Sequence, residues 1–184
     1  MKRWIKWTAA SIAGLGAVAL FVAPKAATSA LAVGTKAPDF TTRGAIAGKV
    51  FTLKLSDELK KGPVVLYFFP AAFTPGCTAE AHEFAEATDD FRKAGATVIG
   101  MSADPIDKLA RFSTEECRDK FAVASAGPDI VKGYDVALPL KVGLTNRTSY
   151  LIAPTGRIVY AYSAMSYQDH VKNTLAAVKA MQPK

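Results

Sequence analysis

The sequence predicts an α/β fold in which a central mixed β-sheet carries helices on both faces. Two observations predict it: strand-forming runs alternate with segments of helical periodicity, and one of the runs is apolar throughout, as in a strand buried on both faces. No internal repeat or long linker interrupts residues 33–184, so we expect a single domain there. Half of the 184 residues are hydrophobic and 21% are charged, which favours a packed core over disorder.

The clearest strand is the continuous apolar run 64–69, and residues 97–101 form a second strand. Apolar residues recur at helical spacing between them, so strand, helix and strand make a right-handed βαβ unit. A further helix follows, with Asp104 as its N-cap and Pro105 in its first turn. One stripe of this helix contains Ile106, Leu109, Ser113 and Cys117.

The C-terminal half supplies the remaining elements. Residues 121–125 predict a short strand, and 148–153 with 157–162 predict an antiparallel hairpin around the turn residues 154–156. Residues 167–181 have the periodicity of a closing amphipathic helix. Together these elements predict a layered arrangement compatible with the thioredoxin fold.

Residues 1–32 resemble a secretory signal peptide that is cleaved from the mature chain. The first seven residues are cationic, 8–23 are apolar and uncharged, and 30–32 supply the small residues that a signal peptidase reads. Cleavage is expected after Ala30 or Ala32. A retained anchor is the alternative, although the apolar run of about 16 residues is shorter than the ~20 that span a bilayer. Export would place the chain in the periplasm of a Gram-negative host, where a disulfide can persist, with no stable membrane insertion after cleavage.

The net charge of +7 comes largely from this leader, because Lys2, Arg3, Lys6 and Lys25 precede any acidic residue. The chain after residue 32 carries a net charge of only +3, without a long run of lysine and arginine. The composition therefore argues against nucleic acid as a partner.

The most informative motif is PAAFTPGC, from Pro70 to Cys77, directly after the apolar strand. If Thr74 is the N-cap and Pro75 the first helical residue, Cys77 lies in the first turn. Free backbone N–H groups and the positive end of the helix dipole favour a thiolate there. The positions three residues before and after Cys77 are Thr74 and Glu80, which excludes dithiol exchange through a CxxC motif. The Thr74 hydroxyl, in place of the first sulfur of that motif, can donate a hydrogen bond to the thiolate or to a bound oxygen ligand. This geometry suits attack on an O–O bond.

The spacing of Pro70, Thr74 and Cys77 resembles the signature of the peroxiredoxins, and TPGCT resembles their bacterioferritin comigratory protein, or Q-type, branch. The segments GTKAPDF at 34–40 and NRTSYLI at 146–152 resemble the family in the expected order. The resemblance covers nearly all of residues 33–182. It implies a thioredoxin-like, thiol-dependent peroxidase that reduces hydrogen peroxide, organic hydroperoxides or both, without a metal or other cofactor.

The resemblance also implies roles for individual residues. Cys77 would be the peroxidatic nucleophile, which attacks a peroxide, releases water or alcohol and becomes a sulfenic acid. Arg147 would contact both the thiolate and the peroxide. A guanidinium there stabilises the thiolate and the charge that develops on the leaving oxygen. Thr74 would align sulfur and peroxide, Pro70 would shield the site, and Glu80 would orient Arg147 by an ion pair.

Four of these residues also have a purely structural interpretation. Cys77 could be an inert buried thiol, Arg147 a surface cation, Glu80 a favourable acid in a first helical turn, and Pro70 the end of a strand.

The resolving thiol is left open. Many relatives carry it five residues after the first cysteine, where this chain has His82, interpreted as a solvated helix residue near Glu86; His170 is interpreted as solvated too. Cys117 is either the resolving thiol, which requires Cα atoms within about 7 Å of each other and local unwinding, or a core residue. The reductant is expected to be a thioredoxin-like protein or a low-molecular-weight thiol. The branch resemblance implies a monomer or weak dimer.

Two other functions compete with this prediction. An exported copper carrier of the same fold needs paired cysteines three residues apart and a downstream histidine, whereas His82 follows Cys77 without a second sulfur. A non-catalytic binding module would show no unusual peroxide reactivity at Cys77.

Overall fold

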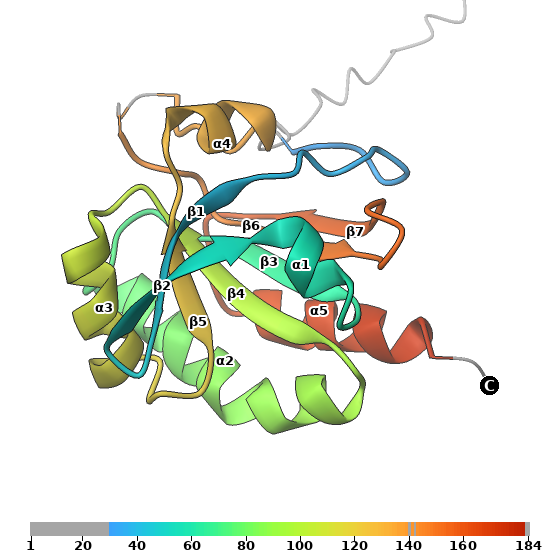
Figure 1. Cartoon of the computed structure of the whole chain (residues 1–184), viewed down its shortest axis with the longest axis horizontal. Coiled ribbons are helices and arrows are strands. Elements are labelled where there is room, and N and C mark those ends of the chain that lie inside the picture. Colours follow the sequence, from blue (N-terminus) through green and yellow to red (C-terminus); the bar gives the residue numbers. More distant parts are fainter. Residues whose placement is uncertain (1–29, 140, 142, 183–184) are drawn as a thin grey trace, which may run out of the picture.

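Seven strands and five helices make up the described part of the chain, as Figure 1 shows. The computed structural model describes residues 30–139, 141 and 143–182, so residues 1–29 of the predicted signal peptide lie outside the described residues. The strands are β1 (Thr41–Ile46), β2 (Lys49–Lys54), β3 (Val64–Phe68), β4 (Thr97–Ser102), β5 (Ala122–Ser125), β6 (Thr148–Ile152) and β7 (Ile158–Ser163). The helices are α1 (Leu55–Leu59), α2 (Pro75–Lys93), α3 (Ile106–Glu115), α4 (Pro128–Gly133) and α5 (His170–Ala180).

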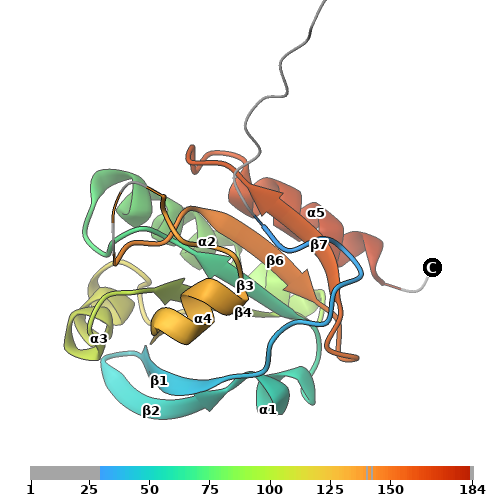
Figure 2. The ribbon, with the colours of Figure 1, turned by 90° about the horizontal axis from the view of Figure 1, so that it is seen from above.

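The strands form one mixed sheet in the order β2-β1-β5-β4-β3-β6-β7, which confirms the predicted sheet. The predicted βαβ unit is present, because β3 and β4 pair in parallel and α2 connects them. The predicted hairpin is also present, since β6 and β7 pair antiparallel. Figure 2 shows the β1–β2 hairpin and β7 at opposite edges of the sheet.

The β1–β2 hairpin was not predicted. Its turn is made by Ala47 and Gly48, which both have positive φ, as in the turns that best match the twist of two-residue hairpins. Alanine is uncommon in that conformation, so the sequence carries none of the Asn-Gly or Asp-Gly signals that identify such a turn. Its strands are also largely exposed, and they lack a continuous apolar run.

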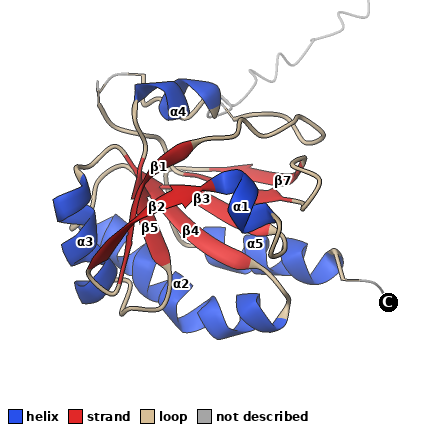
Figure 3. Cartoon of the chain, in the orientation of Figure 1, coloured by secondary structure: helices blue, strands red, loops and turns tan. Residues whose placement is uncertain are grey.

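Helices cover both faces of the sheet, as predicted. In Figure 1, α4 lies above the sheet and α2 and α5 lie below it, and Figure 3 shows the strands as the middle layer. Every residue of β3 is buried, and its side chains alternate between two cores. Val65 and Tyr67 pack with residues of α2, α3 and α5, whereas Leu66 and Phe68 pack with residues near α1 and α4.

The N-terminus of α3 differs from the prediction. Pro105, not Asp104, occupies the N-cap position, and no side chain caps this helix. The carboxylate of Asp104 instead accepts hydrogen bonds from the backbone N–H of Ala72, at 2.6 Å, and from the hydroxyl of Ser102, at 2.8 Å. Asp104 is therefore used to hold the loop before α2 rather than to start α3.

Two helix boundaries also differ. The helix α3 ends before Cys117, which lies in the following turn and not on the predicted helical stripe. Arg118 and Asp119 both adopt left-handed conformations, which a helix cannot continue through. The closing helix α5 begins at His170, a few residues later than predicted. Across the residues that the structure describes, we find no helix with the length and apolarity of a membrane span.

The packing of Tyr67 against Gly100 gives a first prediction. The Tyr67 ring stacks on Phe84 with centroids 4.1 Å apart, and a Cβ atom at Gly100 would lie 2.9 Å from both Cζ and Oη of Tyr67. Because the ring cannot retreat into Phe84, we expect Gly100→Ala to lower the free energy of unfolding by about 1–3 kcal/mol in urea titrations. Gly127→Ala is the control, since its Cβ would meet no atom within 4 Å. An equal effect of both substitutions would contradict this account.

Candidate active site

Cys77 lies in the first turn of α2, as the sequence predicts. Thr74 is the N-cap residue in an extended conformation, Pro75 is the first helical residue and Cys77 is the third. The thiol side chain is only 2% exposed. Backbone N–H groups of a first helical turn have no helical acceptors, so the surroundings favour an anion at the sulfur.

The loop that leads into α2 is fixed by two short hydrogen bonds. The hydroxyl of Thr74 donates to the carbonyl of Ala71 at 2.9 Å, and the N–H of Ala72 donates to Asp104. Pro70 is half-buried at the start of this loop. The Thr74 hydroxyl thus donates within the loop and not to the sulfur, with which it was predicted to align the peroxide.

Arg147 is the residue immediately before β6, and its guanidinium contacts the Cys77 thiol. Its Nη2 donates to Sγ of Cys77 at 3.4 Å, its Nε donates to the carbonyl of Met165 at 3.1 Å, and its Nη1 bonds to the carboxylate of Glu80. The arginine is 4% exposed. Each guanidinium nitrogen has an acceptor, so the cation is held in one orientation against the sulfur.

Glu80 lies one turn further along α2 and is fully buried. The contact expected between Glu80 and Arg147 is present and is made through Oε2 of the carboxyl group. The other oxygen, Oε1, has no hydrogen-bond partner among the described residues. Burial raises the pKa of Glu80 to about 8, against the opposing effect of the Arg147 charge. A carboxyl group with this pKa is largely protonated at neutral pH.

The interpretation of His170 as solvated is wrong, because its side chain is completely buried. Its Nδ1 lies 2.8 Å from the hydroxyl of Ser149, and its Nε2 lies 2.9 Å from the carbonyl of Ala164. Burial lowers the pKa of His170 to about 4. A sequence signal existed: His170, Thr174 and Val178 recur every four residues on the buried side of α5.

His82 is half-exposed, but its partner differs from the expected one. Its Nε2 lies 2.7 Å from Oε2 of Glu116, so it bridges α2 to the end of α3 rather than pairing with Glu86 on its own helix. The contact joins residues 34 positions apart, which helical spacing cannot reveal.

The segment after β7 also belongs to the site, and no sequence pattern predicts it. The Met165 carbonyl accepts from Arg147, and a Cβ atom at Gly76 would touch both Arg147 and the ring of Tyr167. A loop of this kind has no periodicity, so only the folded chain brings it to the guanidinium.

Cys117 is a buried free thiol, as is Cys77, and both belong to the same apolar cluster. Burial raises the pKa of Cys117 well above its ordinary value, and the nearby Glu116 and Asp119 add to this effect. The thiol of Cys117 is therefore protonated and unreactive in this conformation.

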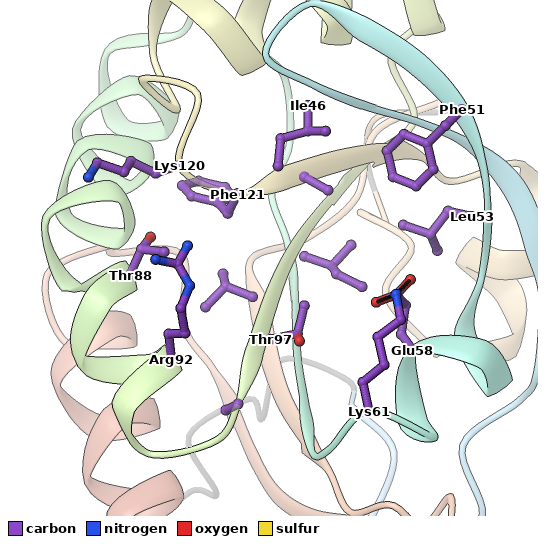
Figure 4. A pocket seen from close by; sticks show the side chains of 14 residues that line it. Ile46, Phe51, Leu53, Glu58, Lys61, Thr88, Arg92, Thr97, Lys120 and Phe121 are labelled. Atoms are coloured by element: carbon purple, nitrogen blue, oxygen red, sulfur yellow. Dashed lines mark hydrogen bonds and ion pairs between the residues drawn. The ribbon is translucent and has the colours of Figure 1, made fainter.

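A separate cavity of about 300 Å³ opens between the β1–β2 hairpin and α2 (Figure 4). Its three cations, Lys61, Arg92 and Lys120, are paired with Glu58 and Asp89. Neither cysteine lines it. In the described ranges, no three His, Cys, Asp or Glu side chains gather as ligands for a metal ion.

The shifted pKa values of Glu80 and His170 predict a pH dependence of stability. In the unfolded chain a glutamate loses its proton above about pH 4.3 and a histidine above about pH 6.5. The folded protein keeps the Glu80 proton up to about pH 8. Between about pH 6.5 and 8 it holds one proton more than the unfolded chain, so stability falls as the pH rises. At about 1.4 kcal/mol per pH unit, we expect a fall of about 2 kcal/mol across this window.

Urea unfolding of the protein and of Glu80→Gln, at several pH values in this window, tests the expectation. The variant should lack this component of the fall, because glutamine does not titrate. Curves with the same slope for both proteins would show that Glu80 is not the group responsible.

Comparisons with known proteins agree with this geometry. The AhpC/TSA family model matches residues 33–161. Peroxiredoxin Bcp of Bacillus subtilis is 31% identical over 158 residues, which cover 83% of this chain and 98% of the relative. The crystal structure of BcpB from Mycobacterium tuberculosis has a TM-score of 0.73 at 30% identity, covering 82% of this chain and 98% of that one.

A structure of peroxiredoxin Q from Xanthomonas campestris has a TM-score of 0.65 at 27% identity and covers 76% of this chain and 90% of its own. The residues that the family model matches include Cys77 on α2 and Arg147 immediately before β6. The chain therefore belongs to the AhpC/TSA family and is a peroxiredoxin, a thiol-dependent peroxidase.

Proposed function

We propose that Cys77 is the peroxidatic nucleophile of this peroxidase. The observation that carries the proposal is the contact of Arg147 Nη2 with the Cys77 sulfur in the first turn of α2. The Cys77 thiolate attacks one oxygen of a hydroperoxide, so that an S–O bond forms and the O–O bond breaks. The second oxygen takes a proton and leaves as water or alcohol, while the sulfur becomes a sulfenic acid.

The neighbouring residues have supporting roles in this proposal. Arg147 stabilises the thiolate and the negative charge on the leaving oxygen, and Glu80 orients Arg147. Thr74 aligns the sulfur and the peroxide when substrate is bound, and Pro70 shields the sulfur from water. The reaction uses no metal or other cofactor.

We propose hydrogen peroxide, organic hydroperoxides or both as substrates. The bacterioferritin comigratory protein of Xanthomonas campestris, 27% identical with a TM-score of 0.65, is reported to have alkyl peroxide reduction activity, which supports the organic class. A thioredoxin-like protein or a low-molecular-weight thiol then reduces the enzyme. We propose a monomer or weak dimer that binds no nucleic acid.

Resolution follows one of two routes. In the first, the Cys117 sulfur attacks the Cys77 sulfenic acid, so that a disulfide forms, the S–O bond breaks and the oxygen leaves as water. The place of Cys117 beside residues in left-handed conformations supports this route. In the second, an external thiol attacks directly, which the buried and protonated state of Cys117 supports. Either route requires local unwinding around the sulfur, since both thiols are buried.

We also propose that residues 1–32 direct export to the periplasm and are removed, supported by the cationic start and the apolar run. The N–H of Leu31 donates to the hydroxyl of Tyr150 at 2.9 Å. Cleavage after Ala30 would keep this residue in the mature chain, and cleavage after Ala32 would remove it.

The first test follows thiol loss and mass after one equivalent of hydrogen peroxide. We expect the reduced protein and Cys117→Ser to react rapidly, and Cys77→Ser to react no faster than a free thiol. A Cys77–Cys117 linkage would establish internal resolution, and sulfenic or sulfinic acid on Cys77 alone would establish the external route. Equal rates for all three proteins would contradict the assignment of Cys77.

The second test addresses the guanidinium. We expect Arg147→Gln to lower the rate constant for peroxide about 10²–10³-fold, as loss of one preorganised charged donor does elsewhere. Stopped-flow measurement of sulfenic acid formation gives the rate constant. Arg92→Gln is the matched control, because Arg92 is an exposed arginine on the same helix as Cys77. A rate within about twofold of the control would show that Arg147 does not act at the sulfur.

A further inference from the structure

Two buried acceptor atoms face each other behind the arginine. Oε1 of Glu80 lies 3.9 Å from Nδ1 of His170, and both side chains are completely buried. The Ala164 carbonyl can only accept a hydrogen bond, so Nε2 of His170 must carry a proton. In the neutral ring Nδ1 is then bare and accepts from the Ser149 hydroxyl. Glu80 Oε1 has no hydrogen-bond partner in the described part of the chain.

With Glu80 ionised and His170 neutral, neither Oε1 nor Nδ1 carries a proton that the other atom could accept. A carboxylate oxygen and a bare ring nitrogen repel each other in a buried site, and a proton on either atom removes the repulsion. A histidine buried only for packing would be satisfied by Ser149 and Ala164. That reading leaves the unpartnered Oε1 of Glu80, turned toward the same ring, unexplained.

Charge balance at the sulfur requires the same proton. Arg147 contacts both Cys77 and Glu80, so one guanidinium serves two acidic groups. With both groups ionised, the buried cluster has a net charge of −1, which a low-dielectric site disfavours. One additional proton on the Glu80–His170 pair makes the cluster neutral while Cys77 remains a thiolate.

We propose that His170 is a positioning residue that shares one proton with Glu80, and that this proton keeps the charge of Arg147 available to the Cys77 thiolate. The inference rests on the proposed role of Cys77 as the nucleophile. When the proton leaves, the Glu80 carboxylate competes with the thiolate for the guanidinium, and Cys77 becomes less reactive.

The surroundings of the pair agree with a proton on Glu80 at neutral pH. Burial raises the pKa of Glu80 to about 8 and lowers that of His170 to about 4. The titratable and charged groups around the pair are Tyr67 from β3, Cys77 and Glu83 from α2, Arg147 before β6, Tyr162 from β7 and Asp169 before α5. Of these, Arg147 is the cation in contact with Glu80, and it limits how high the carboxyl pKa rises.

The proposal predicts a fall on the alkaline side of the pH profile for the reaction of Cys77 with hydrogen peroxide. The rate constant falls near pH 8 as the Glu80 proton leaves. The profile is measured in Cys117→Ser, so that a single thiol reacts, together with the ultraviolet absorbance of the thiolate. Glu80→Gln should lack the alkaline fall.

Two substitutions of His170 test its part. The Asn amide of His170→Asn can donate to Oε1 of Glu80, and His170→Gln keeps a donor for the Ala164 carbonyl while placing no nitrogen beside Glu80. Both changes favour the ionised carboxylate. We expect the alkaline fall to move to lower pH by about one unit, with a roughly tenfold lower rate on that limb. His82→Gln is the matched control and should leave the fall in place.

The decisive step combines the substitutions. If His170 acts through the charge of Glu80, neither His170 variant should change the rate further in a Glu80→Gln background. An effect of the same size in both backgrounds, or a profile without the alkaline fall, would overturn the proposal while Cys77 remains the nucleophile. Failure of the nucleophile assignment is distinguishable, because the unsubstituted protein would then react no faster than a free thiol.

Discussion

The buried guanidinium of Arg147 is the group on which the rest of the site depends. A cation that is 4% exposed must be surrounded by acceptors, and this one has the Cys77 sulfur, the Glu80 carboxylate and the Met165 carbonyl. These partners come from two separate parts of the chain, the start of α2 and the segment after β7. Their positions relative to one another are therefore set by a single planar group with fixed donor directions.

The sheet explains how this arginine meets a cysteine 70 residues earlier. The strands β3 and β6 are antiparallel neighbours, with Phe68 opposite Thr148. The end of β3 and the start of β6 therefore lie at the same edge of the sheet. The chain continues from β3 into the cysteine loop, and Arg147 immediately precedes β6. The alternation of β3 places α2 against the same core as α5, which brings His170 beside Glu80.

The local parts of this arrangement could be predicted from the sequence, and the parts that depend on distant contacts could not. The buried strand, the first turn of α2 and the β6–β7 hairpin follow from apolar runs, Pro75 and turn residues. The hydrogen bond of His170 to Ser149, the use of Asp104 by the Ala72 loop and the contact of His82 with Glu116 each join segments far apart in the chain. In the sequence, an aspartate such as Asp104 that accepts a hydrogen bond from a remote loop cannot be distinguished from one that caps its own helix.

The burial of the Cys77 sulfur affects a small peroxide and a protein thiol differently. A small peroxide needs less room at the sulfur than a thiol on a second protein does, and Cys77 is only 2% exposed. Under the proposed function, each cycle would therefore alternate between a closed form suited to the small oxidant and an opened form suited to the reductant. The free-energy difference between these forms would then set two opposing rates. A more accessible opened form would speed reduction of the sulfenic acid, and it would also expose the oxidised sulfur for longer to a second oxidant.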